Sequence, residues 1–415
     1  MDILIVTPHY LPGSGPNAAL YSMLSEELVC RGHSVTVISA VPHYPSGRVP
    51  PGYQQYGIKM TVEKGVRVIR VGVPSVDRSK LGWRLFQLLC YQVGAIYSGL
   101  RQSYQVVLLS NPALSTGLPL AFLAVMRRKP AVFSIHDVYP HVGIALGVFR
   151  HRAVIATVGA MERFCLRHAR YVRILSTSFI PGMQSLGVPA AKMRLIYDWV
   201  DTELIHPLPR ENTFTDEQGL LDKFVVLYAG NIGLSQGLEH VLAAAEHLAD
   251  QRDIQFLLIG EGSGRAPLVA QANQRGLHNV RFLPYQPRAR LPEMLATADI
   301  SLVPLQRGIA SASLPSKIFS ILASGRPLIA SVDEGSDTWN LVQSSQGGLC
   351  IPPEDSQRLV EAILQLKSDP ARRETLGQNG RRYALQHHSP AYAAEQFEQI
   401  FSLILNGRVS GGVSC

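Results

Sequence analysis

The sequence lacks several patterns that would tie it to a particular chemistry. Its five cysteines are scattered and include no C-x-x-C pair, so neither a disulfide framework nor a zinc site is predicted. It has no low-complexity tract, no internal repeat and no D-x-D motif of the kind that holds a mobile metal. These absences exclude a disulfide-stapled secreted domain and a repeat array, and they favour a globular protein of the reducing cytoplasm.

The sequence also lacks a long, uninterrupted hydrophobic run. Its N-terminus, Met1–Thr7, has no basic region and is followed by a proline, which is typical of a strand rather than a signal peptide. The longest apolar stretch, residues 81–100, contains Arg84, Gln87 and Gln92, which argues against a membrane span. Two alternatives remain for this stretch: a helix packed on a sheet, or a helix lying in the bilayer interface.

Acidic residues are scarce in the first half of the chain. Residues 1–200 hold 21 Lys or Arg against 8 Asp or Glu, whereas residues 201–415 hold 18 against 23. A basic half predicts an anionic partner, but no recognition helix or aromatic-studded basic strand accompanies the charge, so nucleic acid is not favoured. An anionic membrane surface explains the charge better. The basic residues that we expect to face it are Arg78, Lys80, Arg84, Arg101, Arg127, Arg128 and Lys129.

What the sequence does contain is a regular alternation of strand-like and helix-like segments. This alternation predicts doubly wound parallel sheets. At 415 residues the chain is too long for one ordinary core, so two Rossmann-like α/β domains are expected. The expected strands are 3–7, 35–39, 66–71, 106–109, 132–135, 172–175, 225–228, 255–259, 280–282, 300–303 and 328–331, and the expected helices are 17–31, 114–128, 153–168, 238–249, 266–275, 291–296, 316–323, 356–366 and 392–405.

The domain boundary is expected between Asp198 and Lys223, where the periodic pattern gives way to a Pro-rich polar connector. We therefore predict an N-terminal domain of residues 1–205 and a C-terminal domain of residues 206–389. The last helical segment, within residues 390–405, has no strand after it, and we expect it to pack back on the first domain.

Two polar turns in the first half are candidate ligand sites. The turn after the first strand contains Gly13, Ser14 and Gly15, whose small size would let the backbone approach a ligand, although a plain strand–helix turn would also use glycine. His136 and Asp137 end a later strand at the carboxyl edge, where doubly wound sheets bind ligands. There His136 would hydrogen-bond developing charge and Asp137 would orient it; the alternative is an ordinary polar strand end.

The second half carries the features of a diphosphate site. Gly230, Asn231 and Gln236 surround a helix start after this domain's first strand. Lys317 stands at the start of a later helix, where its charge opposes the helix dipole unless an anion binds there. A surface lysine is the alternative. A further Gly-rich turn carries the weaker candidate Glu261, since such turns are common on structural grounds alone.

In these segments the chain resembles the family 4 glycosyltransferases, retaining enzymes with the two-domain GT-B fold. Within that family it is similar to the bacterial polysaccharide-assembly branch that includes L-fucosamine and colanic-acid fucosyl transferases. The similarity covers nearly the whole length. The matching segments are 41–48, 137–140, 145–147, 198–201, 225–238, 315–319 and 325–327.

The resemblance implies two Rossmann-like domains that face a cleft, the second holding a sugar nucleotide and the first binding the acceptor. By position, residues 13–15 would lie against the donor diphosphate, His136 near the transferred sugar, and residues 283–285 beside the nucleobase. The chain departs from the family at the charged positions. The usual Arg and Lys on the diphosphate fall at Asn231 and Gln236, and the paired glutamates fall at Ala312 and Ser320.

We therefore expect other residues to replace the missing charges. Lys317 would supply the positive charge, with Arg326 as a second candidate, and Glu334 or Asp333 would contact the ribose. The predicted donor-binding residues are Gly13, Ser14, Gly15, Gly230, Asn231, Gln236, Glu261, Leu283, Pro284, Tyr285, Ser316, Lys317, Ser320, Arg326 and Glu334, and the predicted catalytic residues are His136 and Asp137.

The function implied by the resemblance is retaining transfer of an N-acetylated or deoxy hexose from a nucleotide sugar. The resemblance to this branch of the family favours UDP as the nucleotide. The acceptor would be a lipid-linked (polyprenyl-pyrophosphate) saccharide of cell-surface polysaccharide synthesis, met at the inner face of the plasma membrane by a cytoplasmic, peripheral enzyme. No cofactor or metal is expected, so activity would persist in a chelator. Two rivals stay open: a GT-B-shaped UDP-sugar epimerase or hydrolase, and a non-catalytic sugar-nucleotide-binding subunit.

Overall fold

The chain forms two compact units in the computed structural model, which describes residues 1–407 except 16, 78–79, 141–143, 145–150 and 310–313. Unit 1 comprises Met1–Tyr197 and the segment from Pro390 onward, and unit 2 comprises Asp198–Ser389. Arg78, Ala312 and the matching segment 145–147 lie outside the described residues. Each unit has its own sheet and its own core.

Unit 1 is built on an eight-stranded sheet of order β3-β4-β2-β1-β5-β6-β7-β8. All neighbouring strands are parallel except β3 and β4, which form an antiparallel pair at one edge. The central strands β1, β5 and β6 are almost entirely apolar and buried, because parallel sheets are covered on both faces. The strands are β1 Asp2–Val6, β2 Ser34–Ala40, β3 Ile58–Glu63, β4 Val66–Val71, β5 Val106–Ser110, β6 Ala131–Ser134, β7 Tyr171–Ile174 and β8 Met193–Leu195.

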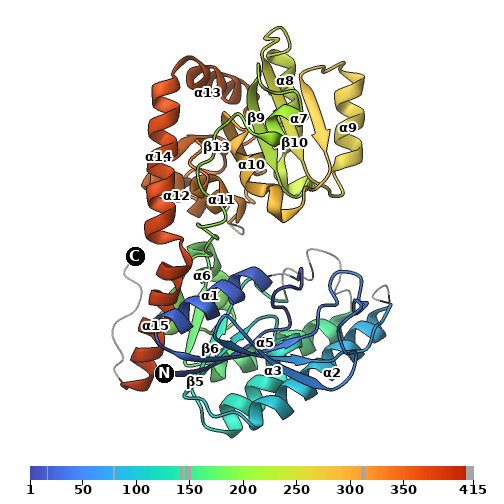
Figure 1. The fold of residues 1–415 in the computed structure, drawn as a ribbon, viewed down its shortest axis with the longest axis vertical. Helices are drawn as coiled ribbons and strands as arrows, with labels where there is room; N and C mark the ends of the chain where they lie inside the picture. Colours follow the sequence, from blue (N-terminus) through green and yellow to red (C-terminus); the bar gives the residue numbers. More distant parts are fainter. Residues whose placement is uncertain (16, 78–79, 141–143, 145–150, 310–313, 408–415) are drawn as a thin grey trace. The chain divides into compact units, whose positions relative to one another are not determined.

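Helices cover both faces of this sheet (Figure 1). Helix α1 packs with α15 on one face, while α2 and α3 lie together on the other. Helix α3 continues into the π-helical segment η1 after Pro119, since proline cannot donate to the regular helical ladder. The helices of unit 1 are α1 Ala18–Cys30, α2 Leu81–Leu100, α3 Ala113–Pro119, η1 Leu120–Met126, α5 Arg152–His168, α6 Ile180–Ser185 and α15 Pro390–Leu405.

Unit 2 is built on a fully parallel six-stranded sheet of order β11-β10-β9-β12-β13-β14. Helices α8, α9 and α13 pack on one face and form the main core cluster with alternate residues of β9, β10 and β12. The strands are β9 Phe224–Ala229, β10 Ile254–Ile259, β11 Val280–Leu283, β12 Ile300–Pro304, β13 Leu328–Ser331 and β14 Gly348–Ile351. The helices are α7 Thr213–Glu217, α8 Leu238–His247, α9 Arg265–Gln274, α10 Leu291–Ala296, α11 Lys317–Ala323, α12 Asp337–Ser345, α13 Ser356–Ser368 and α14 Pro370–His387.

The predicted pair of Rossmann-like α/β sheets is confirmed, but several elements were missed. Among them are β3, β14 and α14. Helix α14 is polar around most of its circumference and contains Gly377 and Gly380, so no apolar stripe reveals it. The first of these glycines allows close packing, because a Cβ there would lie 2.1 Å from the carbonyl oxygen of Gly325.

Unit 2 begins before the expected residue 206. The segment from Asp198 is bonded to the C-terminal part of α14: the Val200 N–H donates to the His388 carbonyl at 2.9 Å, and Arg381 donates to the carbonyls of Thr202 and Ile205. These contacts join residues that are distant in sequence, which is why composition alone placed the boundary later. Within the described ranges, no helix combines the length and the apolar character that crossing a bilayer requires.

Candidate functional site

A pocket of about 250 Å³ opens in unit 2 at the carboxyl ends of β9 and β10. Helices α10 and α11 and the segment after β11 form its other walls. Most of its lining is apolar, with a few polar groups at the end nearest α11. The lining residues are Leu227, Ala229, Gly230, Ile259, Tyr285, Gln286, Leu291, Met294, Leu295, Ser301, Ser316, Lys317, Ser320 and Ile321.

Lys317 is the one cationic side chain among these lining residues. Its Nζ is buried and lies 3.8 Å from the centroid of the Tyr228 ring, and none of the described residues accepts a hydrogen bond from it. Burial lowers the pKa of Lys317 to about 7. A cation–π contact of this kind contributes up to about 2 kcal/mol when desolvated, but it leaves the three ammonium hydrogens without acceptors.

Glycine at position 230 makes room for this ammonium. A Cβ on Gly230 would lie 3.1 Å from the Lys317 Nζ. The following residues fold around Tyr228, whose hydroxyl donates to the Asn231 carbonyl at 2.5 Å and to the Gln236 Oε1 at 3.4 Å. Asn231 and Gln236, the residues expected at the family's Arg and Lys positions, therefore hold the tyrosine that supports Lys317. Burial also raises the pKa of Tyr228.

Two glycine-bearing loops form the rim of the pocket and are bonded to each other. The N–H of Ile232 donates to the Glu261 carbonyl at 2.8 Å, and the N–H of Gly264 donates to the Ile232 carbonyl at 2.9 Å. Gly260 has φ +151°, and a Cβ there would lie 1.8 Å from the Gly230 carbonyl oxygen. Only glycine permits this approach, so the Gly-rich turn serves packing between loops.

Some of the other predicted donor residues line the pocket and others do not. Ser316, Ser320 and Tyr285 line the pocket with Lys317. Leu283 and Pro284 precede Tyr285 at the end of β11, and the Leu283 carbonyl accepts from the Gly260 N–H at 3.0 Å. Glu261 and Glu334 are not among the lining residues: Glu261 pairs with Arg265 at 3.7 Å, and Glu334 is exposed beyond β13.

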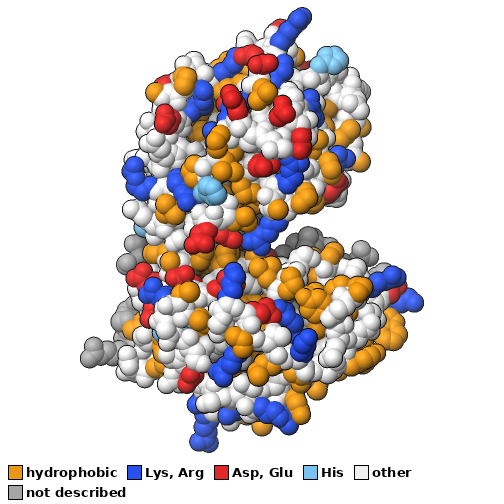
Figure 2. Space-filling view, viewed as in Figure 1, with side chains coloured by type: hydrophobic (Ala, Val, Ile, Leu, Met, Phe, Trp, Pro, Cys, Tyr) orange, Lys and Arg blue, Asp and Glu red, His pale blue; other side chains and the backbone are white. Residues whose placement is uncertain are grey.

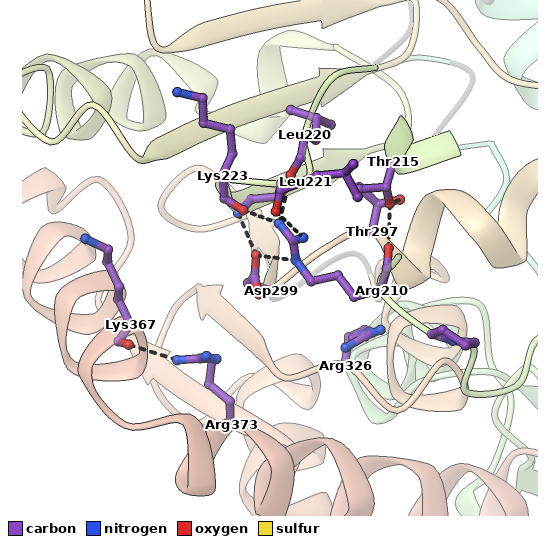
Figure 3. Close-up of polar contacts among 12 residues, drawn as sticks. Arg210, Thr215, Leu220, Leu221, Lys223, Thr297, Asp299, Arg326, Lys367 and Arg373 are labelled. Carbon is purple, nitrogen blue, oxygen red and sulfur yellow. Dashed lines mark hydrogen bonds and ion pairs between the residues drawn. The ribbon is translucent and has the colours of Figure 1, made fainter. Parts of the chain in front are cut away.

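Arg326 does not fit its predicted role as a second diphosphate cation. It precedes β13, so it lies at the amino edge of the sheet, opposite the pocket, and it lines another cavity with Asp299 and Arg381. There its Nη2 donates to the Leu208 carbonyl at 3.0 Å. Figure 3 shows Arg326 beside the Arg210–Asp299 pair, whose Nε–Oδ2 distance is 3.1 Å. Sequence proximity to Lys317 was misleading because α11 carries the chain across the sheet.

His136 follows β6 at the carboxyl edge of the unit 1 sheet. Its Nε2 lies 2.9 Å from the Tyr21 hydroxyl, and its Nδ1 lies 3.5 Å from the Arg173 Nη1. A guanidinium can only donate, so this contact suits a tautomer with its lone pair on Nδ1. Asn111 holds the backbone on both sides: its Oδ1 accepts from the His136 N–H at 2.8 Å, and its Nδ2 donates to the Asp137 carbonyl at 2.5 Å.

The sequence analysis did not identify the residues that surround His136. Arg173 lies in β7 and is fully buried, with its Nε donating to the Ile196 carbonyl at 2.7 Å. An arginine inside an otherwise apolar strand was the available signal, because a buried charge is kept only where the surrounding groups need it. Tyr21 and Asn111 gave no such signal, since each is an ordinary residue of α1 or of a strand end.

The first turn uses its glycines within the chain. A Cβ on Gly15 would lie 2.2 Å from the His9 ring, and one on Gly13 would lie 3.0 Å from the Tyr10 carbonyl oxygen. The Ser14 hydroxyl donates to the Tyr44 carbonyl at 3.0 Å. The plain structural alternative therefore accounts for this turn, and its contact with a diphosphate stays a prediction.

The predicted basic residues gather around α2 and η1. Lys80 precedes α2, Arg84 lies on it and Arg101 follows it, with the Arg101 guanidinium 3.5 Å from the centroid of Tyr97. Arg127, Arg128 and Lys129 follow η1.

Two Rossmann-like units, one of them with a cation-bearing pocket at the carboxyl ends of its strands, define a protein of the GT-B class. Residues 14–199 match the family described as glycosyl transferase 4-like domain, and residues 210–383 match glycosyl transferases group 1. The chain is 29% identical over 375 residues to WcaI of Escherichia coli K12, which is named for glycosyl transfer in colanic acid biosynthesis; the match covers 88% of this chain and 92% of WcaI.

Solved structures share the fold over the whole length. Sucrose-phosphate synthase of Thermosynechococcus elongatus is similar with a TM-score of 0.72 at 20% identity, covering 98% of this chain and 100% of that one. Anabaena HepE in complex with UDP-glucose has a TM-score of 0.66 at 16% identity, covering 97% and 99%. The chain belongs to the family 4 glycosyltransferases of the GT-B fold, and it is a hexosyltransferase.

Proposed function

We propose that this enzyme transfers an N-acetylated or deoxy hexose from a nucleoside-diphosphate sugar held in the unit 2 pocket. The buried ammonium of Lys317, which has no hydrogen-bond acceptor among the residues that the structure describes, carries this proposal. A charged group without hydrogen-bond acceptors is costly inside a protein. The diphosphate of the donor would accept its hydrogen bonds and restore its full charge.

The apolar part of the pocket would hold the nucleobase. Tyr285 is half-exposed there, beside Leu291 and Met294, and an aromatic face next to aliphatic side chains suits a flat, largely apolar ring. UDP is the favoured nucleotide, because the branch resemblance points to UDP-sugars and HepE binds UDP-glucose in its complex.

The chemistry proposed is retaining transfer. The bond from the anomeric carbon to the diphosphate oxygen breaks, and an acceptor hydroxyl bonds to the same face of the sugar and passes its proton to the departing diphosphate oxygen. Negative charge grows on the departing diphosphate, so the charge of Lys317 stabilises the transition state more than the ground state. His136 would steady the sugar without becoming a nucleophile, with Tyr21 and Arg173 fixing its ring. We expect the transfer to proceed without a metal ion.

The acceptor proposed is a lipid-linked saccharide of cell-surface polysaccharide synthesis. The similarity to WcaI supports the polysaccharide class, and the basic residues around α2 and η1 suit a pyrophosphate-bearing lipid in an anionic membrane. The enzyme would meet this acceptor at the inner face of the plasma membrane.

The first test is titration calorimetry of the pure protein with UDP, GDP and ADP, beside thermal unfolding with the same ligands. A nucleotide at one hundred times its Kd would stabilise the protein by about 2.7 kcal/mol. Lys317→Met should weaken UDP binding roughly tenfold or more, because hydrogen bonds to a charged group contribute about 1.5–3 kcal/mol. Arg326→Met is the matched control, since it removes a cation at the opposite edge of the sheet, and it should leave the Kd within about twofold.

Equal, small effects of the two substitutions would refute the role of Lys317. Absence of binding to any nucleotide would bring forward the non-catalytic subunit. Turnover of UDP-sugar without an acceptor would favour the epimerase or hydrolase, and loss of transfer in EDTA would contradict metal-independent chemistry.

A further inference from the structure

Helix α2 exposes one apolar face along its whole length. Seven large apolar side chains on it are between 41% and 57% exposed. The opposite side of the helix is packed, with Tyr91, Ala95 and Ser98 buried. The helix therefore packs on the sheet, which was one of the two alternatives for this stretch, and it also presents apolar residues outward. The exposed residues are Trp83, Leu85, Phe86, Leu89, Val93, Tyr97 and Leu100.

The edge strand β3 extends this apolar surface. Its apolar residues Ile58, Met60 and Val62 are 40–68% exposed. In the β3–β4 pairing, Ile58 lies opposite Val71, whose side chain would be 2.3 Å from a Cβ on Gly94 of α2. Side chains at alternate positions share a face, so the exposed row of β3 lies on the same side of the sheet as α2.

The α3–η1 segment extends the surface on the other side of α2. Leu118, Val125 and Met126 are exposed there, and both α3 and η1 pack against α2. We call the exposed apolar residues of β3, α2, α3 and η1 the α2 face. Figure 2 shows hydrophobic side chains gathered on the side of unit 1 where Figure 1 places α2 and α3, with Lys and Arg nearby. Monomeric proteins rarely expose so many neighbouring apolar side chains without a partner.

The charge of the residues around the α2 face indicates which kind of partner it binds. Between Asp77 and Asp137 the sequence contains seven Lys or Arg and no Asp or Glu. Two copies meeting through this face would bring like charges together without acidic residues to offset them, which disfavours a homodimer. An apolar surface with basic residues at its border, and with Trp83 and Tyr97 on it, matches the interface of an anionic bilayer.

We propose that the α2 face docks this enzyme on an anionic lipid bilayer, with α2 lying in the plane of the interface and β3 and η1 inserted beside it. This inference rests on the proposed function in that it gives the lipid-linked acceptor its location. Apolar side chains enter the headgroup boundary while Lys80, Arg84, Arg101 and Arg128 contact lipid phosphates. Each basic residue near such a surface strengthens binding roughly fivefold.

The test measures binding of the full chain to vesicles of phosphatidylcholine alone and of phosphatidylcholine with phosphatidylglycerol. The wild type should bind the anionic vesicles and shift its tryptophan emission to the blue. The double variant Phe86→Glu/Val93→Glu should weaken this binding at least tenfold while circular dichroism and UDP affinity stay unchanged. The matched control Leu221→Glu/Leu364→Glu makes the same change at exposed apolar residues of unit 2 and should bind vesicles as the wild type does.

Met60→Glu tests the extension to β3 and should weaken vesicle binding as well, by about threefold or more. The proposal is overturned if the wild type does not bind anionic vesicles, or if the two double variants bind these vesicles with the same affinity. It is also overturned if Phe86→Glu/Val93→Glu abolishes a dimer seen in sedimentation, or if the wild type binds an acidic protein but no vesicle. If the protein bound vesicles but no nucleotide, the proposed donor site would be refuted and the proposed membrane docking would not. The experiment therefore distinguishes the two proposals.

Discussion

At the scale of single residues, the site depends on one buried amine. Lys317 is the residue expected to replace the Arg and Lys of the family pattern, and its ammonium is held over Tyr228 with no acceptor among the described residues. Its lowered pKa of about 7 means that the free enzyme carries this charge only part of the time near neutral pH. Donor binding would return the charge, because an adjacent diphosphate favours the protonated form.

The lowered pKa of Lys317 predicts that UDP affinity decreases as the pH rises. Only the protonated amine binds the diphosphate well, so above pH 7 binding must take up a proton, and UDP affinity should fall by up to tenfold per pH unit until the pKa of the complex is reached. The second ionisation of the phosphate, near pH 6, lies below this window. Calorimetry from pH 7 to 9 measures the effect. The Lys317→Met variant should give a flat profile, and parallel profiles in both proteins would contradict the assignment.

At the scale of elements, the rim of the pocket depends on two loops that approach too closely for any side chain. Gly230 and Gly260 meet just after the ends of the adjacent parallel strands β9 and β10. The hydrogen-bond ladder between these strands continues beyond β9, because the Gly230 N–H donates to the Ile259 carbonyl at 2.9 Å. The strand–turn–helix pattern was readable from the sequence, whereas the contact between the turns depends on which strands are neighbours.

Gly260→Ala should therefore destabilise the protein and open the rim. Gly276→Ala is the control, because Gly276 also has positive φ but has open space around its Cβ position. Strain of the backbone alone costs about 1–3 kcal/mol, so the alanine at 260 should lower the free energy of unfolding by that amount plus the steric term. Urea unfolding measures both. Similar losses in the two variants would show that the loops do not touch as described.

At the scale of the whole molecule, helix α15 follows unit 2 in the sequence but belongs to unit 1. Helix α15 packs on α1, Phe397 and Phe401 are fully buried, and Glu398 pairs with Arg31 at 2.6 Å. The Arg31 side chain holds the pKa of Glu398 below its usual value. Helix α15 thus completes a core whose strands all precede residue 197 in the sequence.

Phe401→Ala should consequently weaken unit 1. Loss of a buried phenylalanine costs about 3–5 kcal/mol, and hydrogen exchange should rise in α1 and β1 while β9 and β10 keep their protection. Leu405→Ala, at a partly exposed position of the same helix, should have little effect. Equal loosening of both sheets would mean that α15 supports the entire molecule instead of unit 1.

The sequence was enough to predict the fold class and the family. Alternating β-branched runs and helix-length segments indicate parallel sheets whatever their order, and ordered matches such as those at 137–140 and 315–319 identify glycosyltransferases without coordinates. It also singled out Lys317, because a lysine at the start of a helix is out of place unless an anion binds.

The three-dimensional structure, in contrast, was needed to show which candidates share a pocket. It gathered Lys317, Tyr228 and Gly230 at one edge of the unit 2 sheet and left Arg326 at the other, since the eight residues of helix and turn between Lys317 and Arg326 carry the chain across the sheet. It also turned the apolar rows of β3 and α2 to the same side of unit 1. Strand order and the direction of side chains depend on long-range contacts, which spacing along a chain does not record.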